Sequence, residues 1–292
     1  MEYGFVDNAG TRLHYATTGA GPLVVMIHGF PDFWYTWRHQ MAGLGDRYRV
    51  VAYDQRGYNL SDKPVDESAY AMRWLVADLE AVIRHFGEDS AVVVGHDWGG
   101  SVAWNTAIGR PDLVDRLVVL NLPHPRGFLA AIRGNPEALA GTDYARRFRD
   151  GSADDPDIYF GGPMTPERLA GWVTDDAARP RYIEALARSD PRAMLCYYKQ
   201  NYPDLWSGNF NPQKMPPNVR VPTLMFHGLA DAALHPDGLN NTWDWIDAAF
   251  TLMTVPAAGH FVQQDAADFV TRYLRLWLDA ALAADAGPAV QP

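Results

Sequence analysis

The hexapeptide Gly95-His96-Asp97-Trp98-Gly99-Gly100 follows an apolar run at residues 91–94 and precedes a stretch that is compatible with a helix. Its glycines have the spacing of a nucleophile elbow, a sharp turn between a strand and a helix whose middle residue is the nucleophile. That position usually holds serine, whereas here it holds Asp97. A carboxylate that attacks an sp³ carbon forms an ester, and water can cleave that ester at its carbonyl. The elbow therefore predicts alkyl transfer to Asp97 followed by hydrolysis.

Short apolar runs on both sides of the elbow predict a parallel sheet. They alternate with amphipathic stretches such as residues 74–86, whose apolar positions recur at helical spacing. Buried parallel strands joined by crossover helices have this pattern. The runs lie at residues 23–27, 50–53, 91–94, 117–120, 221–226 and 250–255. We therefore predict an α/β fold with a mostly parallel, doubly wound sheet.

The pattern changes after residue 126, where successive helical stretches replace the strand-like runs. One of these helices is expected to begin with Thr165 as its cap and Pro166 at its first position. We interpret residues 127–215 as a helical lid inserted between two parts of one core. The predicted division is residues 1–126 and 216–280 for the core, 127–215 for the lid and 281–292 for a flexible tail.

Two further polar residues follow predicted strands. Asp231 comes shortly after the run that ends at residue 226, and His260 after the run that ends at residue 255. Functional groups of an open parallel sheet gather at the carboxyl ends of its strands, so we expect both side chains beside Asp97. The chain order is then nucleophile, acid, base. Asp237 is the alternative acid, but the GxxDxxL spacing around Asp231 favours Asp231.

Composition excludes several classes of function. The formal net charge is −10 over 292 residues, which argues against a nucleic-acid partner. The chain has a single cysteine, no apolar run long enough to span a membrane and no signal-peptide pattern, so we expect a soluble, cytoplasmic protein without disulfides. No Cys/His cluster has zinc spacing, and the chemistry predicted for Asp97 requires no metal or organic cofactor.

Six segments together give the chain a specific resemblance. It resembles an α/β-hydrolase of the epoxide hydrolase family, which is close to the haloalkane dehalogenases, over nearly its whole length. The segments are HGFPDFWYTWR at 28–38, DQRGYNLSDKP at 54–64, GHDWGG at 95–100, NLPHP at 121–125, HGLADAAL at 227–234 and AGHFVQQD at 258–265. One departure is Asn59 where the family commonly has glycine, and asparagine tolerates a left-handed backbone conformation.

The resemblance implies a set of roles at the site. Two lid tyrosines, matched here by Tyr144 and Tyr198, would donate hydrogen bonds to an epoxide oxygen while Asp97 attacks a ring carbon. Water activated by His260 would then cleave the ester and release a vicinal diol. The backbone N–H groups of Phe30 and Trp98 would form the oxyanion hole. The partners implied are a small-molecule epoxide and water, with the protein acting as a monomer or homodimer.

Residues around the first motif are candidates for the pocket wall. We expect Pro31, Trp34, Trp37 and Trp98 to line the substrate pocket. Packing in the core is the alternative for the tryptophans. His28 is placed beside the pocket with a structural role, its ring bonded to a nearby loop.

Two other functions use the same scaffold. A haloalkane dehalogenase would share Asp97 and His260, but that family often has asparagine where this chain has Phe30. Fluoroacetate dehalogenases commonly carry their acid after the preceding strand, where this chain has Asn121. A ligand-binding receptor of the same fold is the alternative from another class, and the presence of all three of Asp97, Asp231 and His260 argues against it.

Overall fold

A computed structural model describes residues 1–202 and 216–285. One eight-stranded sheet forms its centre, with the order β1-β2-β4-β3-β5-β6-β7-β8. Strands β3 to β8 are parallel, and β2 is antiparallel to both β1 and β4. The strands are β1 (Glu2–Asn8), β2 (Thr11–Thr18), β3 (Leu23–Ile27), β4 (Arg49–Tyr53), β5 (Ala91–His96), β6 (Val114–Leu120), β7 (Thr223–Gly228) and β8 (Phe250–Val255). The mostly parallel sheet predicted from the apolar runs is confirmed.

The hairpin of β1 and β2 was not predicted. A two-residue turn, Ala9-Gly10, joins its strands, and both residues have positive φ angles, 50° and 88°. Turns of this kind are usually signalled by Asn-Gly or Asp-Gly. Alanine at the first position removes that signal, so the sequence pattern misses the turn.

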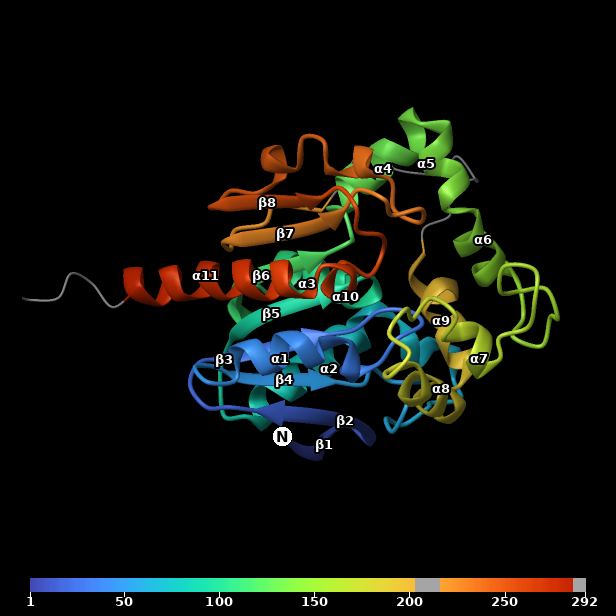
Figure 1. The fold of residues 1–292 in the computed structure, drawn as a ribbon, viewed down its shortest axis with the longest axis horizontal. Coiled ribbons are helices and arrows are strands. Elements are labelled where there is room, and N and C mark those ends of the chain that lie inside the picture. Colours follow the sequence, from blue (N-terminus) through green and yellow to red (C-terminus); the bar gives the residue numbers. More distant parts are fainter. Residues whose placement is uncertain (203–215, 286–292) are drawn as a thin grey trace, which may run out of the picture.

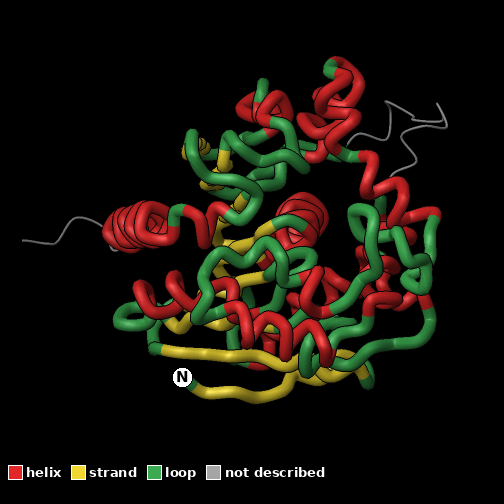
Figure 2. Tube along the Cα trace, turned by 45° about the vertical axis from the view of Figure 1, so that its right-hand side comes forward, coloured by secondary structure: helices red, strands yellow, loops and turns green. Residues whose placement is uncertain are grey.

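Helices cover both faces of the sheet (Figures 1 and 2). Helices α1 (Arg38–Leu44) and α11 (Ala267–Asp285) pack against each other, as do α2 (Met72–His85) and α3 (Trp98–Gly109). Strands β3 and β5 are buried along their whole length, as is expected for central strands covered on both faces. This packing fixes the carboxyl ends of the central strands, where the elbow lies.

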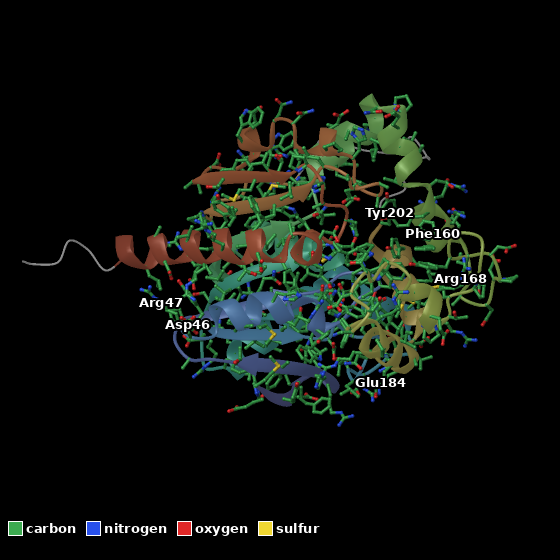
Figure 3. All side chains as sticks on the ribbon, in the orientation of Figure 1. Asp46, Arg47, Phe160, Arg168, Glu184 and Tyr202 are labelled. Atoms are coloured by element: carbon green, nitrogen blue, oxygen red, sulfur yellow. The ribbon has the colours of Figure 1, made fainter. Side chains whose placement is uncertain are left out.

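In the described part of the chain between β6 and β7, the regular elements are helices joined by loops, the longest of which covers residues 151–165. Its helices extend beyond one end of the strands, on the right-hand side of Figure 1. They are α4 (Pro125–Gly134), α5 (Pro136–Gly141), α6 (Asp143–Asp150), α7 (Pro166–Leu169), α8 (Arg179–Arg188) and α9 (Pro191–Asn201). Thr165 caps α7 by accepting a hydrogen bond from the backbone of Arg168, as predicted. Figure 3 shows Phe160, Arg168 and Tyr202 of this region at the opposite end of the molecule from Asp46 and Arg47.

Two predicted boundaries differ from the structure or lie outside it. The first helix of the insertion begins at Pro125, slightly before the predicted boundary at 127, and the predicted end at 215 lies outside the described residues. Helix α11 continues to Asp285, into the predicted tail. Residues 280–284 are alanine and leucine, which have high helix propensity, so the helix outlasts the expected boundary. The remainder of the tail lies outside the described residues.

Candidate active site

Asp97 occupies a sharp turn between β5 and α3. Its backbone has φ 52° and ψ −119°, a conformation that non-glycine residues rarely adopt. Glycines make the turn possible, because a Cβ atom on Gly95 would collide with the backbone of Gly99. A Cβ on Gly99 would in turn collide with the carbonyl of Ile27 at the end of β3. The elbow predicted from the hexapeptide is therefore present, and it holds the Asp97 carboxylate at the carboxyl edge of the sheet.

Two groups contact the Asp97 carboxylate. The backbone N–H of Phe30, in the loop after β3, donates to Oδ1 at 2.8 Å. The Nε2 atom of His260 lies 3.5 Å from Oδ2. Burial alone would raise the pKa of Asp97. His260 and the Phe30 N–H lower that pKa by a larger amount, so it lies below its ordinary value. Asp97 is therefore a buried anion.

His260 is paired with Asp231 on its other side. Its Nδ1 lies 2.9 Å from Asp231 Oδ2, which fixes the tautomer with the Nδ1 proton directed at the carboxylate. Burial lowers the pKa of His260, but the charges and hydrogen bonds of Asp231 and Asp97 outweigh it and raise the pKa to about 10. The alternative acid, Asp237, pairs instead with Asn135 at 2.6 Å. The structure thus brings Asp231, and not Asp237, to His260.

Hydrogen-bond donors converge on Asp231. The backbone N–H groups of Ala233 and Leu234 donate to Oδ1 at 2.8 and 3.0 Å, and the Asn121 side chain donates to Oδ2 at 2.7 Å. Burial raises the pKa of Asp231, but the His260 charge and these donors lower it well below its usual range. Asp231 is consequently ionised, and its carboxylate is held beside Nδ1 of His260.

His96 supports the backbone that carries His260. Its Nε2–H donates to the His260 carbonyl at 2.8 Å. Burial and the neighbouring His260 lower the pKa of His96 to about 3, so the ring is neutral. The histidine that precedes Asp97 in the motif therefore has a geometric role, holding the His260 loop against the end of β5.

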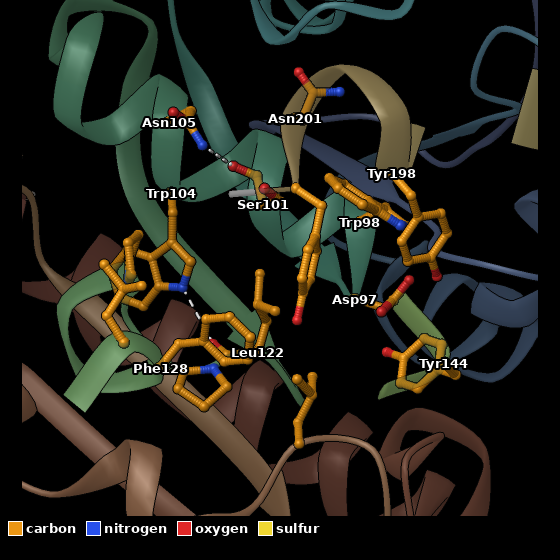
Figure 4. A pocket seen from close by; sticks show the side chains of 15 residues that line it. Asp97, Trp98, Ser101, Trp104, Asn105, Leu122, Phe128, Tyr144, Tyr198 and Asn201 are labelled. Atoms are coloured by element: carbon orange, nitrogen blue, oxygen red, sulfur yellow. Dashed lines mark hydrogen bonds between the residues drawn. The ribbon is translucent and has the colours of Figure 1, made fainter. Parts of the chain in front are cut away.

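Tyr144 of α6 and Tyr198 of α9 approach Asp97 from the inserted helices. In Figure 4 both hydroxyl groups point toward the Asp97 carboxylate. The two rings contact each other edge to face, with centroids 6.2 Å apart. Burial, followed by nearby charges, raises the pKa of both phenols well above the ordinary value. Each is therefore a protonated hydrogen-bond donor over the whole working range of pH.

A cavity of about 200 Å³ opens beside these groups. Asp97, Trp98, Tyr144 and Tyr198 form one end, and Figure 4 shows Trp104 and Phe128 at the other. The rest of the wall is mostly apolar and consists of Ser101, Asn105, Leu122, Pro123, Pro125, Leu129, Asn201, Tyr202 and Leu234. The pocket suits a small apolar molecule with one polar reacting centre.

Four residues that were predicted for the pocket lie elsewhere, and this expectation is corrected. Trp37 is fully buried in the core, and Trp34 faces a separate hollow beside the β1–β2 hairpin. His28 is buried and accepts a hydrogen bond from the backbone of Gln55 at 3.0 Å, which is a structural role. Pro31 is absent from the wall, although its carbonyl accepts a hydrogen bond from Trp172 at 3.2 Å. The chain after Phe30 forms a short helical turn at Trp34–Trp37, and both tryptophans are buried there rather than in the wall of the cavity beside Asp97.

Sequence reasoning missed the function of Asn121 and most of the apolar wall. The sequence marks Asn121 only as a residue that cannot serve as an acid, whereas its side chain donates a 2.7 Å hydrogen bond to Asp231. Its positive φ of 43° at the end of β6 could have marked it as special, but a φ angle is not readable from sequence. No feature of the sequence distinguishes the pocket residues Trp104, Leu122 and Phe128 from residues of the core. Asn59 does adopt the left-handed conformation expected for it, with φ 40°.

The described residues contain no cluster of three or more His, Cys, Asp or Glu side chains that could hold a metal ion. No helix in this part of the chain combines the length and apolar composition needed to cross a bilayer.

The fold, the aspartate elbow and the histidine paired with an aspartate define an α/β-hydrolase, and the family model described as "alpha/beta hydrolase fold" matches residues 22–267. Epoxide hydrolase 1 of Caenorhabditis elegans is 33% identical over 92% of this chain and 68% of its own length. The AB hydrolase superfamily protein YfhM of Bacillus subtilis is 49% identical over 79% of this chain and 82% of its own length. A crystal structure of Bacillus megaterium epoxide hydrolase with an inhibitor covers 94% of this chain and 100% of its own, with a TM-score of 0.82 and 26% identity. The chain belongs to the epoxide hydrolase family of α/β-hydrolases.

Proposed function

We propose that this protein hydrolyses a small epoxide to a vicinal diol through an ester on Asp97. The observation that carries the proposal is the convergence of the Tyr144 and Tyr198 hydroxyls on the Asp97 carboxylate. Two neutral donors opposite a carboxylate match an epoxide, whose carbon is attacked while its oxygen gains negative charge. Family membership and the names of its relatives support the same activity.

In the first step, an Asp97 oxygen attacks one ring carbon and the carbon–oxygen bond of the epoxide breaks. The ring oxygen takes up the developing charge, which the two phenol O–H groups stabilise by hydrogen bonding and proton donation. The Phe30 N–H holds Asp97 Oδ1 at 2.8 Å, which leaves the other oxygen as the attacking atom. The product of this step is a β-hydroxyalkyl ester.

In the second step, water attacks the ester carbonyl and His260 Nε2 accepts its proton. A free His260 is cationic at neutral pH, because two carboxylates raise its pKa to about 10. Esterification makes Asp97 neutral and removes one of those charges, which lowers the pKa of His260. The Nε2 proton of His260 then neutralises the phenolate left by the first step, and Nε2 becomes free to act as a base. The Phe30 N–H, which already faces Asp97, and the Trp98 N–H would hold the oxyanion. Its collapse breaks the ester bond, and the diol oxygen takes a proton from His260. The proton left on the Asp97 carboxyl group then passes to His260, which restores the anionic Asp97 and the cationic His260.

The remaining parts of the chain fit this proposal. The insertion predicted at residues 127–215 would act as the lid, and its described helices α6 and α9 supply the two tyrosines beside Asp97. The wall formed by Trp104, Leu122 and Phe128 would bind an apolar substituent of the epoxide. No step requires a metal or an organic cofactor.

Dehalogenation is the competing reaction, and two features of the site disfavour it. Phe30 has no side-chain donor for a halide, and the Trp98 side chain is in hydrogen-bonding contact with Tyr198. The test uses purified protein with styrene oxide and with a bromoalkane of similar size. We expect diol from the first substrate and no bromide from the second. Release of bromide without diol would overturn the proposal, and reaction with neither would favour a binding role.

A further inference from the structure

Trp172 connects the inserted helices to the two loops that carry the reacting groups. It lies between α7 and α8 and is partly buried. Its ring stacks face to face on Phe261, with centroids 3.4 Å apart and planes inclined by 5°. Its indole N–H donates to the Pro31 carbonyl at 3.2 Å. One side chain thus contacts both the loop after β3 and the loop after β8.

Each of these contacts falls on a residue next to the chemistry. Pro31 follows Phe30, whose N–H donates to Asp97 at 2.8 Å. Phe261 follows His260, and the two rings lie edge to face with centroids 5.1 Å apart. Phe261 also contacts His96, at 5.2 Å between centroids. Movement of Trp172 would therefore be transmitted to the Phe30 N–H and to the His260 ring.

The other contacts of His260 do not fix the distance between its Nε2 atom and Asp97. Asp231 fixes Nδ1 and His96 fixes the carbonyl, but Nε2 is 3.5 Å from Asp97, too long for a strong hydrogen bond. Packing must then set the tilt of the ring. Phe261 and His96 provide that packing, with centroids 5.1 and 4.9 Å from the His260 ring, and Trp172 stacks on Phe261.

Two other contacts hold the segment at residues 172–182 against the core without touching Pro31 or the Phe261 ring. Asp175 pairs with Arg38 at 3.0 Å, and the Tyr182 hydroxyl accepts a hydrogen bond from Gln264 at 2.7 Å. Neither contact involves Pro31 or Phe261. They hold the segment in place. The Tyr182 ring also packs edge to face on Trp172, at 5.2 Å between centroids, and Tyr182→Phe keeps that ring, so this variant is a control for the loss of a docking hydrogen bond alone.

We propose that Trp172 is a positioning residue that sets the Phe30 N–H and His260 for hydrolysis of the ester. The proposal rests on the function proposed above. Formation of the ester uses the two tyrosines and Asp97, which the Phe30 N–H orients. Hydrolysis uses that N–H at the oxyanion and, in addition, needs His260 as the base. Loss of Trp172 therefore slows the second step more than the first, and the ester accumulates.

The test measures the fraction of enzyme present as ester during turnover, by intact-protein mass spectrometry after acid quenching. Trp172→Leu removes the stack and the donor, Trp172→Phe keeps an aromatic ring and removes the donor, and Tyr182→Phe removes one docking hydrogen bond. We expect the hydrolysis rate of Trp172→Leu to fall by up to about 10²-fold, the scale of a 1 Å misplacement, with a smaller fall for Trp172→Phe. The ester fraction should rise in both and stay at the wild-type level in Tyr182→Phe.

The outcomes separate the two proposals. An ester fraction in the Trp172 variants equal to that of Tyr182→Phe would overturn the positioning role, even if kcat falls. Trp172→Phe, which keeps the aromatic ring, decides the question if Trp172→Leu does not fold. Failure of the wild-type protein to consume epoxide would instead refute the proposed function.

Discussion

The donors at the leaving oxygen can be tested one hydroxyl at a time. Tyr198→Phe and Tyr144→Phe each remove one hydrogen-bond donor and keep the ring. Tyr198 is buried and Tyr144 is partly buried, so water restores only part of the lost hydrogen bonding. Removal of one donor from an oxyanion site costs about 10²- to 10³-fold in rate, or roughly 2.7–4 kcal/mol. We expect a loss in this range for each single variant and a further loss in the double variant.

The assay is a single-turnover measurement of epoxide consumption with enzyme in excess, because it reports the alkylation step alone. Tyr159→Phe is the matched control. Its ring also packs against Phe30, at 6.2 Å between centroids, but it does not line the pocket. A Tyr198→Phe rate equal to that of Tyr159→Phe would refute the assignment of the donors, and with it the choice of epoxide as substrate class.

Two further predictions concern the charges behind the nucleophile. Asn121→Ala removes a 2.7 Å hydrogen bond to the charged Asp231 carboxylate. The free energy of unfolding, measured by urea titration at pH 7, should therefore fall by about 1.5–3 kcal/mol. An unchanged unfolding midpoint would show that Asn121 does not stabilise Asp231. The folded-state pKa of His260, about 10, lies above its ordinary value of 6.5. Its stabilising contribution is therefore full below pH 6.5 and is lost as the pH rises toward 10. The stability difference between wild type and His260→Gln should shrink over that interval, and a difference that grows with pH would contradict the raised pKa.

The sequence predicted the parts of the site that depend on local motifs. The elbow glycines surround Asp97, and the conformation of the turn follows from their missing Cβ atoms. The parallel strands follow from apolar runs, and their shared edge brings Asp231 and His260 to Asp97 without any knowledge of side-chain packing. These inferences needed only short-range pattern and topology.

Sequence reasoning failed where a role depends on distant partners. Trp34 and Trp37 stand in the same motif as Phe30, yet the turn that follows directs them into the core or to another hollow. Trp172 acquires its role from Phe261 and Pro31, which are remote from it in the chain. Packing of this kind has no local signature, and only the three-dimensional arrangement reveals it.

The covalent role of Asp97 is the central claim, and oxygen labelling tests it most directly. Wild-type protein is allowed many turnovers of styrene oxide in ¹⁸O-water, and the peptide that contains Asp97 is then examined by mass spectrometry. Because water attacks the ester carbonyl, we expect heavy oxygen in the Asp97 carboxylate, and a first-turnover diol that carries no oxygen from the solvent. A first-turnover diol containing ¹⁸O, with Asp97 unlabelled, would show direct attack by water on the epoxide and would contradict the mechanism.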